Sequence, residues 1–312
     1  GTESRPLSHY FENAGVVVSR TNPDLPLKMA ITLKGSEQDI GTQHIHHDIG
    51  SYAVSLGGVP FIGEPGGLPY SAAVFGPNRF DLKFLNSLGH PVPVVAGQRQ
   101  NGAKPIAANV TVSSDTQTLE MTVNMEPAYN TSTDLNSLVR RMRHDRMTSE
   151  VVIEDRFTAS SAIDFQDAFI LKGTWTWVAS GNDSDTFIVQ RINPLYTKMT
   201  FNKGTESFFL NITADRPFSL STETFTEVGV TITRFAIQLN EQKSEGSVRM
   251  AIQRTAAIPP LANPGFEEAV EAGRPGAPAG WSLSGAPKPE RTTEASAYKS
   301  GVAGLPEPEA QR

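Results

Sequence analysis

Short β-branched and aromatic runs fill the sequence from about residue 15 to residue 254, and they constrain the fold more than any other feature. Gly, Asp, Asn or Pro separates each run from the next, and helical periodicity is nearly absent. This pattern predicts an all-β chain, a large antiparallel multi-strand β-sandwich. The best helical candidate is the weakly amphipathic stretch 134–140. The expected strands are 16–18, 28–33, 51–56, 92–95, 109–112, 119–123, 151–157, 186–190, 208–212, 228–232 and 235–239.

Length and composition set the domain organisation. The chain has 312 residues, 38% of them hydrophobic, with 26 Gly and 22 Pro, which is typical of a turn-rich globular protein able to bury a core. The composition changes near residues 258–260 and becomes rich in Gly, Pro and Ala. We therefore place a β-sandwich domain at 1–260, and at 261–312 a linker with the truncated start of a second β-rich module. A flexible tail is the alternative for the second segment.

Charge and cysteine usage exclude several function classes. The formal net charge of -6 argues against nucleic acid or an anionic membrane as the main partner, because both require a concentrated excess of Lys and Arg. No apolar run is long enough to span a bilayer. The chain has no cysteine, so any metal must be held by histidine and carboxylate ligands. No apolar leader opens the sequence, so we expect a signal peptide to be absent or removed.

A cluster of histidines suggests a functional site. The string His44-Ile45-His46-His47-Asp48-Ile49 holds three of the six histidines in the chain. On a strand, residues 44, 46 and 48 would share one face and His47 would point to the other. Imidazole is a frequent ligand of zinc and a frequent general base at neutral pH. Glu64 and His90, each at an expected strand-to-turn junction, could complete a zinc site.

Two known metal signatures fit this string poorly. Metallo-β-lactamase-like hydrolases carry H-x-H-x-D-H, but Ile49 occupies the last position here, and the helices of that α/β fold are missing. Amidohydrolases begin with H-x-H on a barrel strand and need alternating helices and further histidines downstream. Neither signature accounts for the chain.

A third pattern fits well. The segments 43–52, 57–67 and 86–98 together resemble the C-terminal β-sandwich domain of the heparinase II/III-like polysaccharide lyases. Weaker likeness at 11–20, 139–141 and 151–156 extends the resemblance over most of residues 10–255. The segment 263–267, with Trp281, resembles the opening of a carbohydrate-binding β-sandwich module.

The resemblance implies a role for each residue of the cluster. It assigns His44 to the active cleft, where it assists catalysis, and His46, Glu64 and His90 to Zn²⁺. The acidic ligand of the family is usually Asp, and Glu is one methylene longer but can still bind zinc. Asp48 is expected to orient a neighbouring imidazole as a second-shell residue, and His47 to pack on the opposite side.

The reaction implied by the resemblance is β-elimination in an acidic, uronate-containing polysaccharide such as a glycosaminoglycan or alginate. The proton beside the uronate carboxylate becomes acidic only when that carboxylate is neutralised, so the site needs cationic or hydrogen-bonding groups as well as an acid and a base. Arg79 is our first candidate for binding substrate, and Tyr70 is a candidate phenol near the cleft. Further cationic candidates are Lys83, Arg99, Lys104 and the run 140–143.

The resemblance also implies that this chain holds only part of an active site. In the family the principal tyrosine and the carboxylate-binding residues reside on an N-terminal α/α toroid, which is absent here, so we expect the chain alone to be inactive. An exported bacterial protein, secreted or periplasmic, would suit such a substrate. Two alternatives stay open: a non-catalytic carbohydrate-binding β-sandwich with a structural metal, and a zinc hydrolase that uses metal-bound hydroxide.

Overall fold

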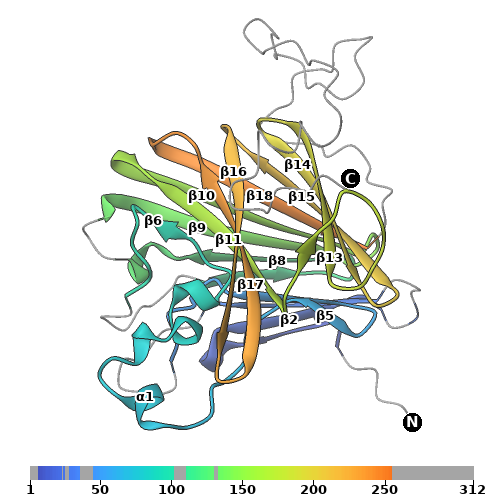
Figure 1. Cartoon of the computed structure of the whole chain (residues 1–312), viewed down its shortest axis with the longest axis horizontal. Coiled ribbons are helices and arrows are strands. Elements are labelled where there is room, and N and C mark those ends of the chain that lie inside the picture. The colour runs from blue at the N-terminus through green and yellow to red at the C-terminus, as the bar shows by residue number, and fades with distance from the viewer. Residues whose placement is uncertain are drawn as a thin grey trace, which may run out of the picture.

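The computed structural model describes residues 6–22, 24, 28–35, 45–101, 110–129 and 133–254. Over these ranges two large β-sheets pack face to face, which confirms the predicted all-β sandwich (Figure 1). The expected second module at 261–312 lies outside the described residues. No helix in the described ranges has the length and apolar character needed to cross a membrane.

Sheet A contains nine strands and carries the region of interest. Its neighbouring strands pair in antiparallel fashion, and β6 joins the edge of β11. In spatial order the sheet consists of β1 (Ser8–Phe11), β2 (Val16–Arg20), β3 (Met29–Lys34), β4 (Tyr52–Leu56), β5 (Val59–Ile62), β11 (Phe165–Lys172), β17 (Val230–Leu239) and β16 (Phe218–Glu227), with β6 (Val94–Val95) beside β11.

Sheet B also contains nine strands. All its pairs are antiparallel except the short parallel contact between its first two members. In spatial order the sheet consists of β12 (Thr176–Trp177), β13 (Thr186–Asn193), β14 (Tyr196–Lys203), β15 (Glu206–Ala214), β18 (Lys243–Gln253), β10 (Glu150–Ile163), β9 (Leu135–Asp145), β8 (Thr118–Asn124) and β7 (Val110–Ser114).

The main hydrophobic core lies between the sheets. Strands such as β3 and β8 bury every second residue, as the two-residue period of a strand requires. Aromatic rings fill the centre, where Phe169 of β11 stacks on Phe235 of β17 with ring centroids 4.7 Å apart. Full burial of one such side chain contributes about 1.5–3 kcal/mol, so these rings are a large part of the stability of the sandwich.

A helical excursion between β5 and β6 covers the outer face of sheet A (Figure 1). It holds a second apolar cluster in which Phe84 and Leu85 pack with Ile170 of β11 and Ile232 of β17. This cover explains why β11 and β17 bury residues on both faces. The short helices of the described chain are α1 (Ala72–Phe75), η1 (Glu12–Ala14), η2 (Arg79–Asp81), η3 (Lys83–Leu85), η4 (Ser87–Gly89) and η5 (Glu126–Ala128).

The helical prediction for residues 134–140 is wrong. This stretch opens β9, which pairs with β8 along one side and β10 along the other. The burial pattern has a period of two residues, with Leu138, Arg140, Met142 and His144 all buried. A short amphipathic run fits either structure, and the long ladders on both sides decide in favour of the strand.

Candidate metal centre

The histidine string does not form the strand that its spacing suggested. Residues 45–50 are a turn that leads into β4, and His44 lies outside the described residues. The backbone N–H of His47 donates to the Leu85 carbonyl at 3.0 Å, and the Ser87 hydroxyl donates to the His47 carbonyl at 3.1 Å. These groups bind the helical excursion instead of a neighbouring strand, so the sheet begins only at Tyr52.

Two further residues hold this turn in place. The Gln100 side chain accepts from the Ile49 N–H at 2.9 Å and donates to the Ile49 carbonyl at 2.7 Å. Gly50 has a φ of +88°, and a Cβ at this position would collide with the sulfur of Met125. The turn therefore requires glycine at position 50 and a side-chain amide at position 100.

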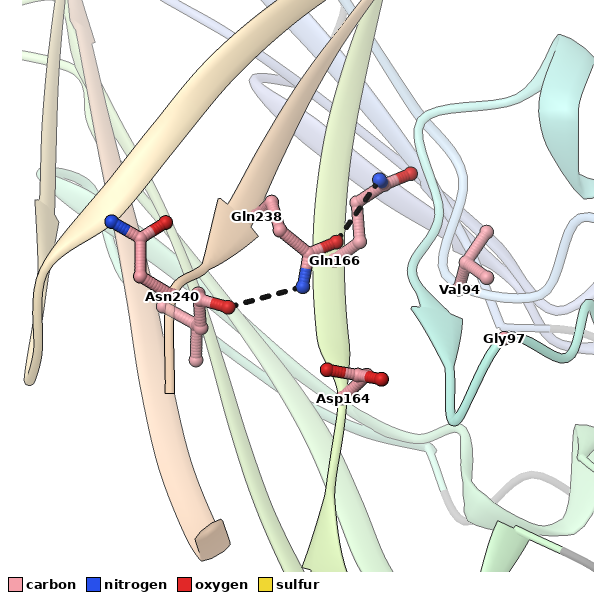
Figure 2. A pocket seen from close by; sticks show the side chains of 7 residues that line it. Val94, Gly97, Asp164, Gln166, Gln238 and Asn240 are labelled. Carbon is pink, nitrogen blue, oxygen red and sulfur yellow. Dashed lines mark hydrogen bonds between the residues drawn. The ribbon is translucent and has the colours of Figure 1, made fainter. Parts of the chain in front are cut away.

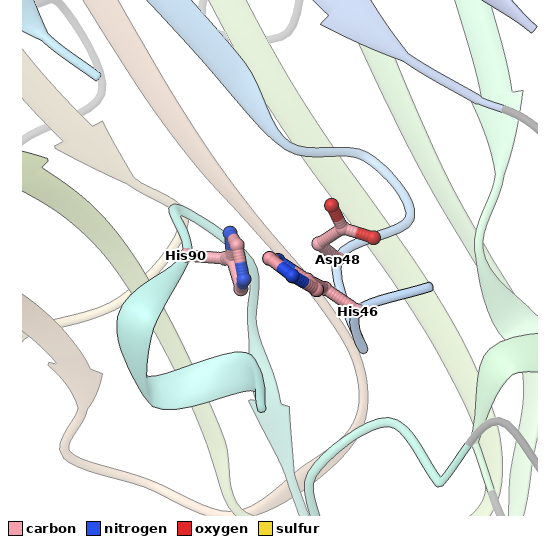
Figure 3. A group of neighbouring side chains, drawn as sticks. All are labelled: His46, Asp48 and His90. Atoms are coloured by element: carbon pink, nitrogen blue, oxygen red, sulfur yellow. The ribbon is translucent and has the colours of Figure 1, made fainter. Parts of the chain in front are cut away.

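The turn brings His46 and Asp48 beside His90, which follows η4 (Figure 3). One nitrogen or carboxylate oxygen from each of the three residues lies within 4.8 Å of the others, and the two imidazole rings are 5.2 Å apart. His90 is fully buried and Asp48 is 5% exposed. Two of the expected ligands, His46 and His90, are thus neighbours. Asp48, which was expected only to orient an imidazole, lies close enough to both to be a ligand itself.

The orientation of His90 leaves one ring nitrogen available as a ligand. Its Nε2 lies 3.1 Å from the Phe84 carbonyl oxygen, which can only accept, so Nε2 carries the proton. Its Nδ1 is buried without a hydrogen-bond partner, although Glu64 Oε2 is only 2.5 Å away. Glu64 also accepts a hydrogen bond from Ser51. Glu64 and His90 therefore form a close charged pair through the ring nitrogen that the Phe84 carbonyl leaves unused.

The environment also sets the protonation of these groups. Burial, and then the charge of His90, lower the pKa of His46 to about 4, so this ring is neutral at pH 7. Burial opposes charge on both His90 and Glu64, but their mutual attraction outweighs it, raising the pKa of His90 and lowering the pKa of Glu64. His46 and Glu64 are thus in forms that bind a metal, whereas His90 has to release a proton when an ion binds.

Asp48 has a second partner, which bears on its role. The Nζ of Lys34 lies 2.6 Å from one carboxylate oxygen and 2.8 Å from the other. Lys34 thus neutralises Asp48 in the absence of any other cation. Both roles considered for Asp48, a ligand or a group that orients an imidazole, are compatible with its position.

The donor set fits zinc. Neutral imidazole nitrogens and a carboxylate are usual zinc ligands, and a tetrahedral site places them about 2.0–2.2 Å from the ion. His90 further shows the arrangement common in metal sites, in which the nitrogen that does not bind metal donates to a carbonyl oxygen. His46, His90 and Asp48 have ligand atoms within 4.8 Å of one another, and Glu64 contacts His90, so either carboxylate could be the third ligand.

Sequence reasoning missed the residue that supports both ligand-bearing segments. The sequence suggested Arg140 as a cation for a polyanion, but it is fully buried and cannot contact a polysaccharide. Its Nη1 donates to the carbonyls of Gly50 at 2.7 Å and Pro91 at 2.6 Å, while Asp155 balances its charge and Asp167 accepts a further hydrogen bond at 3.1 Å. The signal that could have identified this role is the two-residue period of residues 138–144, which places Arg140 on the buried face of a strand.

The remaining candidates lie around the turn. His47 is buried and stacks on Phe80 with ring centroids 3.6 Å apart, outside the group of potential ligands. Arg79 is also buried, and its Nη2 donates to the Ile45 carbonyl at 2.9 Å. Tyr70 is 77% exposed and packs edge-on against Phe75. Tyr70 is therefore a surface residue of the excursion, whereas Arg79 and His47 lie beside the metal candidates.

A separate polar hollow of about 650 Å³ lies where the ends of β11 and β17 meet the β6 hairpin (Figure 2). Gln166 donates to Gln238 at 3.2 Å, and Gln238 donates to the Leu239 carbonyl at 3.1 Å. Asp164 and Asn240 complete its polar lining. None of the candidate site residues lines this hollow, so the histidine group does not depend on it.

Comparison by sequence finds no match, either among family models or among curated proteins. Comparison of folds does find similar structures. A heparinase III structure matches with a TM-score of 0.60 at 10% identity, covering 81% of this chain and 37% of that one. The heparan sulfate lyase HepC from Pedobacter heparinus matches with a TM-score of 0.59 at 15% identity, covering 83% and 38%.

These matches define the class of the fold. The chain has the fold of one part of the heparinase III-type polysaccharide lyases, which confirms the resemblance seen in the sequence. It spans less than two fifths of the length of those structures. At 10–15% identity the likeness concerns architecture, and activity has to be argued from the site itself.

Proposed function

We propose that this chain is the zinc-bearing β-sandwich part of a polysaccharide lyase that acts on an acidic, uronate-containing polysaccharide. The observation that carries the proposal is the convergence of His46, His90 and a carboxylate on a fold shared with heparan sulfate lyases. Such an enzyme would meet its substrate outside the bacterial cytoplasm, in the periplasm or after secretion.

Zinc in this site would have a bracing role. His46 comes from the turn before β4, and His90 from the segment before β6, so an ion bound to both would tie the two segments together. We take Glu64 as the carboxylate ligand because its Oε2 lies 2.5 Å from the buried Nδ1 of His90, where a bound ion would displace the proton between them. When bound, the ion supplies a fixed positive charge and holds its ligands in place.

His44 is the proposed catalytic residue of this chain. It is two residues from His46, so fixing the His46 ring would restrict where His44 can point. An imidazole is suited to move a proton in an elimination, as the base or as the acid for the departing oxygen. The other catalytic groups would come from an α/α toroid domain outside this chain, and the acidic polysaccharide would bind between the two.

Zinc affinity tests the metal assignment directly. Protein purified without chelator should carry about one equivalent of zinc, as a single tetrahedral site requires. Competition with a chromophoric chelator should show weaker binding in His46→Ala and His90→Ala. His9→Ala is the matched control, because His9 is an exposed histidine on β1. Equal affinity in all three variants would remove the ligand assignment.

Product analysis separates the reaction classes. Elimination leaves an unsaturated uronate that absorbs ultraviolet light, whereas hydrolysis creates new reducing ends without a double bond. Incubated with heparan sulfate or alginate, this chain alone should release neither product, because the proposed site also needs the toroid residues. Release of saturated products by the chain alone would favour the zinc hydrolase instead.

A further inference from the structure

Arg79 is a buried cation without an acidic partner. Its side chain is 8% exposed, and within the described part of the chain it forms no ion pair. Its Nη2 reaches the Ile45 carbonyl, but its buried Nε has no hydrogen-bond partner. Burial lowers the pKa of Arg79, and no neighbouring carboxylate offsets this effect. Burying an unpaired charge costs several kcal/mol, so this position is unfavourable for the free protein.

A second unpartnered group lies next to Arg79. The His47 ring stacks on Phe80, and the Arg79 guanidinium lies 4.9 Å from the centroid of the same ring. His47 is 6% exposed, and its Nε2 is buried without a partner. The nearby charges that act most strongly on His47 are those of Arg99 and Arg79, both positive. Two buried polar groups and an exposed arginine thus form a small electropositive region.

The lack of an ion pair is not unique to Arg79 among the described residues: Arg234, 4% exposed, also has a buried Nε and a buried Nη2 without hydrogen-bond partners. Arg140 is balanced by Asp155 and donates a further hydrogen bond to Asp167. Arg191 also stacks on a ring, that of Phe218, and has no ion pair among the described residues. Its guanidinium, however, donates to Thr197 and to the backbone carbonyls of Pro194 and Phe218. Arg79 has only one such acceptor, so its remaining donors are available for a ligand.

We propose that Arg79 and His47, with Arg99 at the surface beside them, form a binding subsite for one oxyanion group, a carboxylate or a sulfate, carried by a saccharide. An oxyanion accepts charge-assisted hydrogen bonds from a guanidinium and would compensate the buried charge. The assignment of a saccharide as the source rests on the proposed function. The binding of the oxyanion does not, because it requires neither the metal nor turnover.

Nitrogen NMR of the histidines tests this subsite. Full-length chain labelled with ¹⁵N-histidine is titrated, with chelator present and ionic strength held constant by NaCl, with sodium sulfate in one arm and sodium glucuronate in the other. We expect a saturable shift of the His47 Nε2 signal in wild type, a weaker shift in Arg79→Lys, and none in Arg79→Gln. A response to sulfate alone identifies a sulfo group, and a response to glucuronate alone identifies a uronate.

Thermal stability provides an independent readout. Because Arg79 lacks an acidic partner, Arg79→Gln should unfold at an equal or higher Tm than wild type without added anion. Arg191→Gln, the matched control, should unfold at a lower Tm because it loses three contacts. The subsite is refuted if neither anion moves the His47 signal of wild type, or if Arg79→Gln keeps the same response. If the zinc assays contradict the metal assignment but zinc-free protein still binds the anion, the metal proposal fails and the subsite stands.

Discussion

The guanidinium of Arg140 donates from inside the sandwich to the backbone carbonyl of Gly50, at 2.7 Å. The same nitrogen donates to the Pro91 carbonyl at 2.6 Å. Gly50 is two residues beyond Asp48, and Pro91 directly follows His90. One buried side chain on β9 therefore fixes the backbone of both segments that carry the candidate metal ligands.

Replacing Arg140 should weaken zinc binding. In Arg140→Lys a single ammonium replaces the planar fork, so it cannot hold two carboxylates and two carbonyls together. We expect zinc affinity to fall about 10–100-fold, the range found for residues that support metal ligands. Arg216→Lys is the control, since Arg216 is equally buried and bonds Asp215 and two backbone carbonyls elsewhere. It should lose stability and keep its zinc affinity. Equal zinc affinity in both variants would contradict the role of Arg140.

The identity of the carboxylate ligand can be decided by two isosteric changes. Glu64→Gln should reduce zinc affinity more than Asp48→Asn, because Lys34 already neutralises Asp48 whereas Glu64 lies against the Nδ1 of His90. Glu64→Asp should retain measurable affinity, since the shorter acid is also a zinc ligand. Chelator competition measures all three variants, and a larger loss in Asp48→Asn would make Asp48 the ligand.

Asp167 should affect stability in a pH-dependent way. Burial, and then the charge of Asp155, raise the pKa of Asp167 to about 8, although Arg140 acts in the opposite direction. Between about pH 4 and pH 8 the folded state therefore holds a proton that the unfolded state has released. The free energy of unfolding should fall as pH rises through this window, by an amount on the order of a few kcal/mol.

Asp167→Asn tests this expectation, because an amide resembles the protonated acid. Urea unfolding at pH 5 and pH 8.5 should show a smaller loss of stability in the variant than in wild type. Asp155→Asn should cost more stability at both pH values, because Asp155 makes the two short contacts to Arg140, at 2.7 and 2.6 Å. An unchanged pH dependence in Asp167→Asn would show that Asp167 is ionised in the folded state.

His144 should produce the opposite pH dependence. Burial, and then the charge of Arg146, lower the pKa of His144 from 6.5 to about 4, while its Nδ1 lies 2.8 Å from the Ser19 hydroxyl. Below pH 6.5 the unfolded state binds a proton that the folded state does not. Stability from His144 is thus complete above pH 6.5 and is lost as pH falls towards 4, by about 2–3 kcal/mol.

His144→Gln should lose less stability than wild type between pH 7 and pH 4.5, measured by urea unfolding with chelator present. His9→Gln serves as the control, because His9 is exposed on β1. It should follow the wild-type curve. A His144→Gln curve parallel to wild type would indicate that His144 titrates normally in the folded protein.

The sequence predicted most of the sandwich because strand signals are local. Alternating apolar residues bounded by turn residues identified runs such as 119–123 and 235–239, which lie within β8 and β17. The same local reasoning made β9 a helix and the histidine string a strand. The first error overlooked a hairpin, because β10 follows β9 after a short turn and pairs with it. The second concerns a segment whose backbone partners lie further along the chain, in the helical excursion.

By itself, the sequence determined the β-rich architecture and the chemistry available to a metal site, since a chain without cysteine has only histidine and carboxylate ligands to offer. The tertiary structure decided which of these groups meet. It placed His90 against Glu64, buried Arg140 behind the turn, and gave Arg79 no acidic partner within the described ranges. The physical reason is that burial and charge pairing depend on contacts between residues far apart in the chain, which no local pattern encodes.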